Sequence, residues 1–199
     1  MIEEWFPTPI FFTDFTDYNS KNKILAKRAY ELKNLNESVD TKWNCDTFNT
    51  LNKEFLLGND DDQTIIDFRD EVGSLVYQFA ECFGVDSKKC QLVCKDFWFN
   101  ISEPGNYQEY HQHPNNHFSA VYYVQTENNC GNIVFKNPES IGDMFQLPTS
   151  VDTIFSYKTA VYEPKDSRLL IFKSNLMHMV EKNKSNIDRI SVAMNFYLE

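Results

Sequence analysis

The alternation of apolar and polar positions divides the sequence into a helical first part and a strand-rich second part. Apolar residues recur at helical spacing over residues 20–36, and they form one continuous stripe over residues 62–83. From residue 92 onward the pattern changes to short runs rich in β-branched and aromatic residues, separated by turn residues. The predicted strands lie in LVCKDFWFNI, YQEYHQH, FSAVYYVQ, NIVFKNP, TIFSYK, AVYEP, RLLIFKS and RISVAMNFYL.

Residues at the ends of the two helices support this division. Ser20 is the predicted N-cap of the first helix. The three aspartates at 60–62 complement the positive end of the second helix dipole, and Gly84 is suited to end that helix. Eight or so strands with no helix after Gly84 indicate an antiparallel sandwich or barrel.

The predicted fold is therefore mainly β with flanking helices, built as a double-stranded β-helix, the cupin-like jelly-roll barrel. A chain of 199 residues is long enough to bury one hydrophobic core. We expect a single domain over residues 1–199, in which helical support at 20–84 is laid over a jelly-roll core at 90–199.

The charge and cysteine content narrow the classes of function. The formal net charge of −10 argues against binding to nucleic-acid phosphates, and scattered basic residues argue against an anionic membrane surface. The N-terminus starts with two acids where a secretory signal is basic, and no apolar run is long enough to span a membrane. Five cysteines without paired spacing do not predict a disulfide framework. These features predict a cytosolic protein.

The four histidines are the strongest chemical signal. His111, His113 and His117 lie within fifteen residues of one another, and His178 stands alone near the C-terminus. A neutral imidazole offers one nitrogen lone pair to a divalent metal, and the period of two places His111 and His113 on one face of a strand. His178 would supply a third ligand from a distant strand. His117 follows the turn residues at 114–116, so we expect it to lie off this register.

The last predicted strand has one apolar and one polar face. Strict alternation puts Ile190, Val192, Met194, Phe196 and Leu198 on one side, and Arg189, Ser191, Ala193, Asn195 and Tyr197 on the other. The polar face is typical of a pocket wall. The planar donors of Arg189 are suited to bind a carboxylate at two oxygens.

Together these residues resemble a known family. The series GNYQEYHQH, SAVYYV, GNIVF, FKSNLMHMV and Arg-x-Ser is similar to Fe(II)- and 2-oxoglutarate-dependent oxygenases. It resembles most the short forms common in phage and marine bacteria, which would place a phage-encoded protein in the host cytosol, and more distantly prolyl 4-hydroxylase. The resemblance implies Fe(II), 2-oxoglutarate and O2, with His111 and His178 as iron ligands and Arg189 as the 2-oxoglutarate anchor.

The chain departs from the commoner pattern at one position. The family has a carboxylate ligand two residues after its first histidine, whereas this sequence has His113. A site of three histidines carries one less negative charge. We favour His113 as the third ligand, with Glu109 or a water as the alternatives.

The resemblance also implies further roles around the site. Ser191 and one of the adjacent tyrosines, Tyr122 or Tyr123, would add hydrogen bonds to 2-oxoglutarate. Candidates for the substrate pocket are Trp98, Tyr107 and Asn195. The implied reaction is hydroxylation, with a peptidyl side chain or a small amino-acid-like metabolite as substrate.

Two other classes are compatible with a barrel of this kind. A three-histidine cupin dioxygenase binds its organic substrate at the metal without a cosubstrate, and it would not require Arg189. A noncatalytic jelly-roll module for binding or structure has no reason to concentrate its histidines in two converging stretches.

Overall fold

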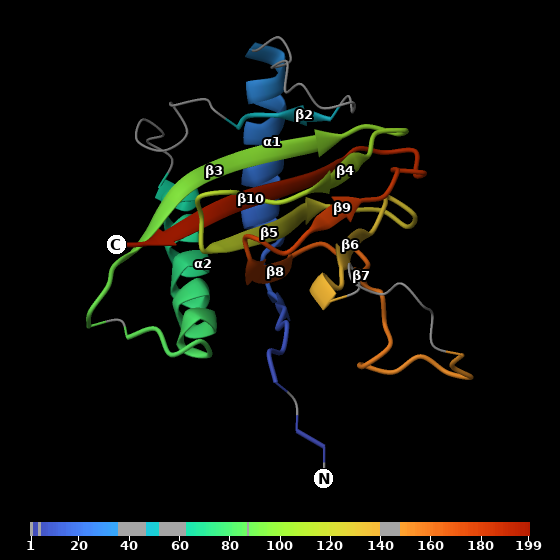
Figure 1. Cartoon of the computed structure of the whole chain (residues 1–199). Helices are drawn as coiled ribbons and strands as arrows, with labels where there is room; N and C mark the ends of the chain where they lie inside the picture. Colours follow the sequence, from blue (N-terminus) through green and yellow to red (C-terminus); the bar gives the residue numbers. More distant parts are fainter. Residues whose placement is uncertain (1, 4, 36–46, 52–62, 87, 140–147) are drawn as a thin grey trace.

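The computed structural model describes residues 2–3, 5–35, 47–51, 63–86, 88–139 and 148–199. Within these residues it has two helices and ten strands, whose arrangement is shown in Figure 1. The elements are β1 (Phe11–Asp14), α1 (Asn19–Leu35), β2 (Phe48–Asn49), α2 (Gln63–Glu81), β3 (Leu92–Ser102), β4 (Gln108–His111), β5 (Phe118–Gln125), β6 (Ile133–Lys136), β7 (Thr159–Tyr162), β8 (Arg168–Lys173), β9 (His178–Val180) and β10 (Arg189–Leu198).

The strands form two antiparallel sheets. The larger sheet has the order β1-β8-β5-β10-β3-β2, and the smaller has the order β4-β9-β6-β7. After β3 the chain passes repeatedly from one sheet to the other, as the strands of a jelly roll do. The predicted fold class, a double-stranded β-helix with flanking helices, is confirmed.

Strand β10 follows the alternation predicted for it. Its even-numbered residues at 190–196 are buried in one hydrophobic core with Leu25 of α1 and Phe68 of α2. The two helices therefore cover one face of the larger sheet (Figure 1). The odd-numbered Arg189, Ser191 and Ala193 line a cavity between the two sheets. The face that the helices leave uncovered is thus the one that carries the site.

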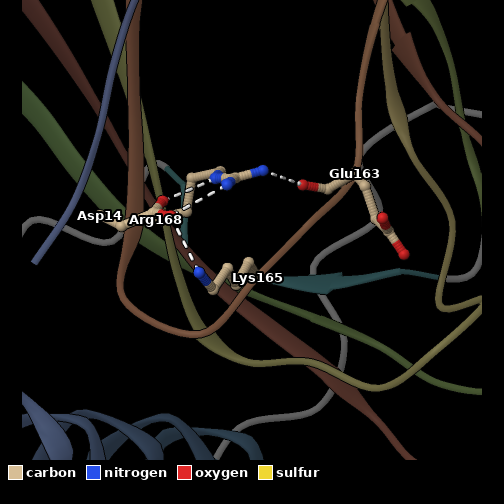
Figure 2. Close-up of polar contacts among 4 residues, drawn as sticks. All are labelled: Asp14, Glu163, Lys165 and Arg168. Carbon is tan, nitrogen blue, oxygen red and sulfur yellow. Dashed lines mark hydrogen bonds and ion pairs between the residues drawn. The ribbon is translucent and has the colours of Figure 1, made fainter.

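The edge strand β1 is fastened to the barrel by charge. Arg168 on β8 donates to the Asp14 carboxylate through Nε at 2.7 Å and Nη2 at 2.9 Å, and Lys165 donates to Asp14 Oδ2 at 3.1 Å (Figure 2). The Arg168 hydrogen bonds lower the pKa of Asp14 to about 2. Asp14 and Arg168 are also direct partners in the register between β1 and β8. Residues 11–14 are thus held at the barrel edge, whereas Trp5, Phe6 and Phe12 remain exposed.

Two details of the sequence interpretation need correction, and a third falls on residues that the structure does not describe. Helix α1 begins at Asn19 rather than after Ser20, and helix ends commonly differ by a residue from a predicted cap. The predicted strand at 153–158 is a turn, because the Thr153 carbonyl accepts hydrogen bonds from the backbone amides of Ser156 and Tyr157. The aspartates at 60–62 lie outside the described residues.

Candidate metal centre

Three histidines at or just beyond the ends of two strands of the smaller sheet converge on one point. His111 ends β4, His113 lies two residues beyond it, and His178 begins β9. His111 and His178 are direct partners in the strand register, with ring centroids 4.2 Å apart. One potential ligand atom from each residue lies within 4.8 Å of the other two. We call these three residues the histidine cluster.

The hydrogen bonds of the histidine cluster determine which nitrogen faces the shared point. Nδ1 of His111 donates to the Glu109 carbonyl at 2.7 Å, and Nδ1 of His178 donates to the Leu176 carbonyl at 2.9 Å. Nδ1 of His113 donates to Asn195 Oδ1 at 2.7 Å. A carbonyl oxygen only accepts, so each Nδ1 carries the proton and each Nε2 keeps its lone pair. Three such lone pairs fit a divalent metal that accepts imidazole nitrogen, and iron is such a metal.

Burial keeps these imidazoles in the neutral state that a metal requires. It lowers the pKa of His111, and burial together with the neighbouring charge of His111 lowers the pKa of His113 to about 4. Burial and the charges of both other histidines lower the pKa of His178 well below its usual range. At neutral pH, protons therefore compete poorly for these lone pairs.

Arg189 occupies the same cavity and is 4% exposed. Its Nη1 donates to the carbonyls of Cys130 at 2.9 Å and Gly131 at 3.0 Å, and its Nη2 donates to Ser102 Oγ at 2.7 Å. These contacts use three of the five guanidinium donors. All three acceptors are neutral, and burial lowers the pKa of Arg189 from its usual value. The positive charge is thus held in place without an acidic partner among the described ion pairs.

The adjacent tyrosines face opposite sides of the sheet. Tyr123 lines the cavity, and its burial raises the pKa of its phenol to about 12. Tyr122 instead faces the helices, where its hydroxyl donates to Asn22 Oδ1 on α1 at 2.6 Å. Ser191 lies in the cavity lining with Tyr123, its partner in the β5–β10 register. Tyr122 is therefore removed from the candidate cofactor-binding residues, because consecutive residues of a strand point to opposite faces.

The remaining candidates are divided between the cavity and its surroundings. Trp98 lines the cavity, with its ring centroid 5.6 Å from that of His113. Asn195 contacts His113 from outside the lining, and Tyr107 is 39% exposed and not part of the lining. His117 lies in a bend, where its Nδ1 accepts from the Leu198 amide at 3.1 Å.

The Glu109 carboxylate is not a member of the cluster of potential ligand atoms found among the described residues. This residue contributes its backbone carbonyl to His111 instead. Its side chain is exposed, as expected for a residue on the outer surface of an edge strand. In the described structure, His113 therefore provides the third potential ligand atom.

Several residues around the site were not identified from the sequence. Ser102 and Asp96 share the parity of Trp98 along β3, so the period of two would have placed both on the cavity side. The Cys130–Gly131 turn that holds Arg189 carried no chemical signal beyond its glycine. Its contact depends on a pairing of distant segments that a single sequence does not specify.

Comparison with known proteins identifies the family of this chain. A family model described as "Putative 2OG-Fe(II) oxygenase" matches residues 96–195, half of the chain. The protein belongs to this family of 2-oxoglutarate- and Fe(II)-dependent oxygenases. No curated protein sequence matches the chain. The enzyme is a 2-oxoglutarate-dependent dioxygenase whose cofactors are Fe(II), 2-oxoglutarate and O2, as the sequence resemblance implied.

Solved structures show the same fold at low sequence identity. A prolyl-4-hydroxylase from Pseudomonas putida has a TM-score of 0.64 at 13% identity, covering 96% of this chain and 92% of its own. The viral collagen prolyl hydroxylase from Paramecium Bursaria Chlorella virus-1 has a TM-score of 0.61 at 10% identity and 94% coverage of both chains. The epimerase SnoN from nogalamycin biosynthesis has a TM-score of 0.67 at 11% identity, covering 96% of this chain and 76% of its own.

The helices give no indication of membrane insertion. Across the described residues, neither α1 nor α2 combines the length and apolar character that a membrane span requires.

Proposed function

We propose that this dioxygenase hydroxylates a peptidyl side chain, with the histidine cluster as its iron site and Arg189 as the anchor for 2-oxoglutarate. A small amino-acid-like metabolite is the alternative substrate. The observation that carries the proposal is the buried Arg189 guanidinium, which lines the same cavity as the histidine cluster and has only neutral acceptors among its described contacts. A buried charge of this kind is costly without an anion.

Several residues that line the cavity would bind 2-oxoglutarate. Two guanidinium donors remain beyond the three contacts of Arg189, which matches the two oxygens of the distal carboxylate of 2-oxoglutarate. Tyr123 and Ser191 line the same cavity, and their hydroxyls would add hydrogen bonds. Val121, Ile133 and Val180 contribute apolar walls that limit water around the reacting groups.

The cofactors supply the oxidation itself. When bound, Fe(II) and 2-oxoglutarate would supply the oxidising chemistry with O2: one oxygen atom would go to the succinate formed with CO2 from 2-oxoglutarate, and the other to the substrate as a hydroxyl. The protein's part is to hold three neutral imidazoles, the Arg189 guanidinium and the substrate in fixed positions. A three-histidine cupin that acts without a cosubstrate is disfavoured, because it gives Arg189 no anion to bind.

The role of Arg189 is tested by succinate formation over a range of 2-oxoglutarate concentrations. Removing one partner of a buried charge pair costs roughly 3–5 kcal/mol, so Arg189→Ala should raise the KM for 2-oxoglutarate by a hundredfold or more. Arg189→Lys should fall between wild type and Arg189→Ala, because it keeps the charge and loses the planar pair of donors. An unchanged KM in Arg189→Ala would exclude Arg189 as the anchor.

The substrate class is a separate question. Two structural neighbours are prolyl hydroxylases, which favours a peptidyl substrate, whereas SnoN is an epimerase of nogalamycin biosynthesis. Proline-containing peptides and free amino acids should be compared as substrates by mass spectrometry. Gain of one oxygen atom in a peptide side chain would support the proposal. Oxygen gain confined to free amino acids would favour the metabolite alternative, and gain in neither would count against both.

A further inference from the structure

His113 is held differently from the other two members of the histidine cluster. His111 and His178 donate from Nδ1 to backbone carbonyls two residues earlier, on their own segments. His113 lies beyond the end of β4, and its Nδ1 reaches across to the larger sheet, where Asn195 Oδ1 lies at 2.7 Å and Ser119 Oγ at 2.9 Å. Its orientation therefore depends on side chains rather than on the backbone.

The amide of Asn195 is itself oriented by a carboxylate. Its Nδ2 donates to Asp96 Oδ2 at 2.8 Å, and its Oδ1 accepts from Ser119 Oγ at 2.9 Å. Because a carboxylate only accepts, Asp96 fixes the amide nitrogen on its own side and leaves the amide oxygen facing His113. The oxygen then requires the proton on His113 Nδ1. Asp96 thus determines, through Asn195, that Nε2 of His113 keeps the lone pair.

The strand register builds this arrangement. Asn195 on β10 is paired with Asp96 on β3 and with Ser119 on β5. The register between β10 and β3 shifts immediately after Asn195, because Phe196 is paired with Cys94. Such irregularities change the direction in which nearby side chains point, and they are frequent beside functional sites. Asn195 is 5% exposed and Ser119 is fully buried, so water competes little for these hydrogen bonds.

We propose that Asp96 and Asn195 are positioning residues for the metal site, and that the Asp96–Asn195–His113 network replaces part of what a carboxylate ligand would provide. The proposal rests on the proposed function, in which His113 is the third ligand. Three imidazoles bring no negative charge to Fe(II), whereas Asp96 places one negative charge two hydrogen bonds away from the ligand. An acceptor on the far nitrogen of an imidazole also makes its metal-binding nitrogen more basic.

Anaerobic Fe(II) titration of Asp96→Asn in two backgrounds tests the network. The introduced amide keeps the size of the side chain but can donate as well as accept, so it would no longer fix the Asn195 amide. Changes to the hydrogen-bond partners of metal ligands typically cost about 10–100-fold in affinity, and we expect a loss in this range in the wild-type background. In the His113→Asp background, which has no imidazole to orient, we expect a loss under about threefold. Equal losses in both backgrounds would overturn the proposal.

A second measurement reads the tautomer directly. In metal-free protein labelled with 15N-histidine, long-range 1H–15N correlations distinguish a proton on Nδ1 from one on Nε2. Asp96→Asn should convert His113 from the Nδ1-protonated form to a mixture of both forms. His111 and His178 should not change, because their acceptors are backbone carbonyls. A His113 signal identical to that of wild type would overturn the proposal.

Two control variants separate this network from the metal site as a whole. Asp86→Asn removes an exposed turn carboxylate that accepts from the Lys88 amide, and it should leave Fe(II) affinity unchanged. His113→Ala should weaken Fe(II) binding if His113 is a ligand. If His113→Ala binds Fe(II) like wild type, His113 is not a ligand and the proposal is overturned, even if Asp96→Asn still shifts the tautomer. The network would then orient His113 without affecting the metal.

Discussion

His111 and His178 face each other directly across the β4–β9 pair, and the register shifts between Gln108 and His111 on β4. Gln108 is paired with Val180, so three residue steps on β4 correspond to two on β9. Residues three apart in a regular strand point to opposite faces. Both Gln108 and His111 nevertheless line the cavity, because the irregularity turns the end of β4 inward. The proposed iron site therefore depends on a local register shift in a strand as well as on the histidines.

The first prediction concerns the share of His178 in metal binding. His178→Ala removes one of three potential ligand atoms, so the loss of Fe(II) affinity should exceed the roughly 10–100-fold typical of changes to a ligand's partners. The measurement is anaerobic Fe(II) titration, with one metal per chain expected for wild type. The matched control is His117→Ala, since His117 lies outside the histidine cluster and its ring contacts only the Leu198 amide among the described side-chain hydrogen bonds. Equal losses in the two variants would refute the assignment.

A second prediction concerns the pH range of metal binding. Protonation competes with metal below the pKa of each ligand, and burial holds these pKa values under the ordinary 6.5, to about 4 for His113. Fe(II) affinity should therefore stay nearly constant as pH falls from 7.5 to about 6, and decline only closer to the lowered values. Binding isotherms across this range provide the test. Affinity that begins to fall at 6.5 would show that the histidines titrate normally.

The same shifts affect the stability of the metal-free protein. The unfolded chain takes up protons on its histidines near pH 6.5, whereas the folded His113 does so only near pH 4. The contribution of the neutral, buried His113 to the free energy of unfolding is therefore present above pH 6.5 and is lost as pH falls toward 4. Denaturant titration of the metal-free protein across this window should show a falling free energy of unfolding.

The sequence was informative where a short-range period determined the structure. The alternation along 189–194 correctly separated the helix-facing residues from the cavity-facing ones, because a strand packed between two layers has two different environments. The spacing of His111 and His113 predicted their approach, although His113 lies beyond the end of β4. Only the structure reveals the register shift between Gln108 and His111, which turns this end of β4 toward the cavity.

Other features depended on contacts between distant segments. The choice between Tyr122 and Tyr123 could not be made from a run of apolar residues with no polar alternation. The segment at 153–158 has the composition of a strand, yet Thr153 closes a local turn there. The partners of Arg189 come from β3 and from the turn before β6, and no local pattern in the sequence joins these segments.

A fourth prediction concerns the ion pair that holds β1 against β8. The pKa of Asp14 is about 2 in the folded protein against an ordinary 3.8, so its contribution is complete above 3.8 and disappears as pH falls toward 2. The Asp14 side chain is 32% exposed, and solvent screening therefore weakens the ion pair. We expect Asp14→Asn to lower the free energy of unfolding by about 1 kcal/mol at neutral pH. Denaturant titrations should show this difference at pH 7 and a much smaller one near pH 2. Lys165→Gln is the milder comparison, because Lys165 is 63% exposed.

The last prediction concerns the glycine that supports Arg189. Gly131 has φ +94°, and its carbonyl accepts a hydrogen bond from Arg189 Nη1 at 3.0 Å. A Cβ at this position would lie 2.1 Å from the Glu181 carbonyl oxygen and 3.1 Å from Arg189 Nη1. Backbone atoms cannot yield as a flexible side chain does, so Gly131→Ala must displace the turn and with it the acceptors of the guanidinium. We expect both a loss of stability and a higher KM for 2-oxoglutarate.

Gly84→Ala separates the two causes of that loss. Gly84 also has positive φ, at +78°, but a Cβ there meets nothing within 4 Å. Both variants bear the left-handed backbone cost of roughly 1–2 kcal/mol, whereas only Gly131→Ala adds the clash and the contact with Arg189. Thermal unfolding and succinate assays on the two variants should therefore show destabilisation in both and a raised KM in Gly131→Ala alone. If Gly131→Ala folds and retains the wild-type KM, the Gly131 turn does not determine the position of the Arg189 guanidinium.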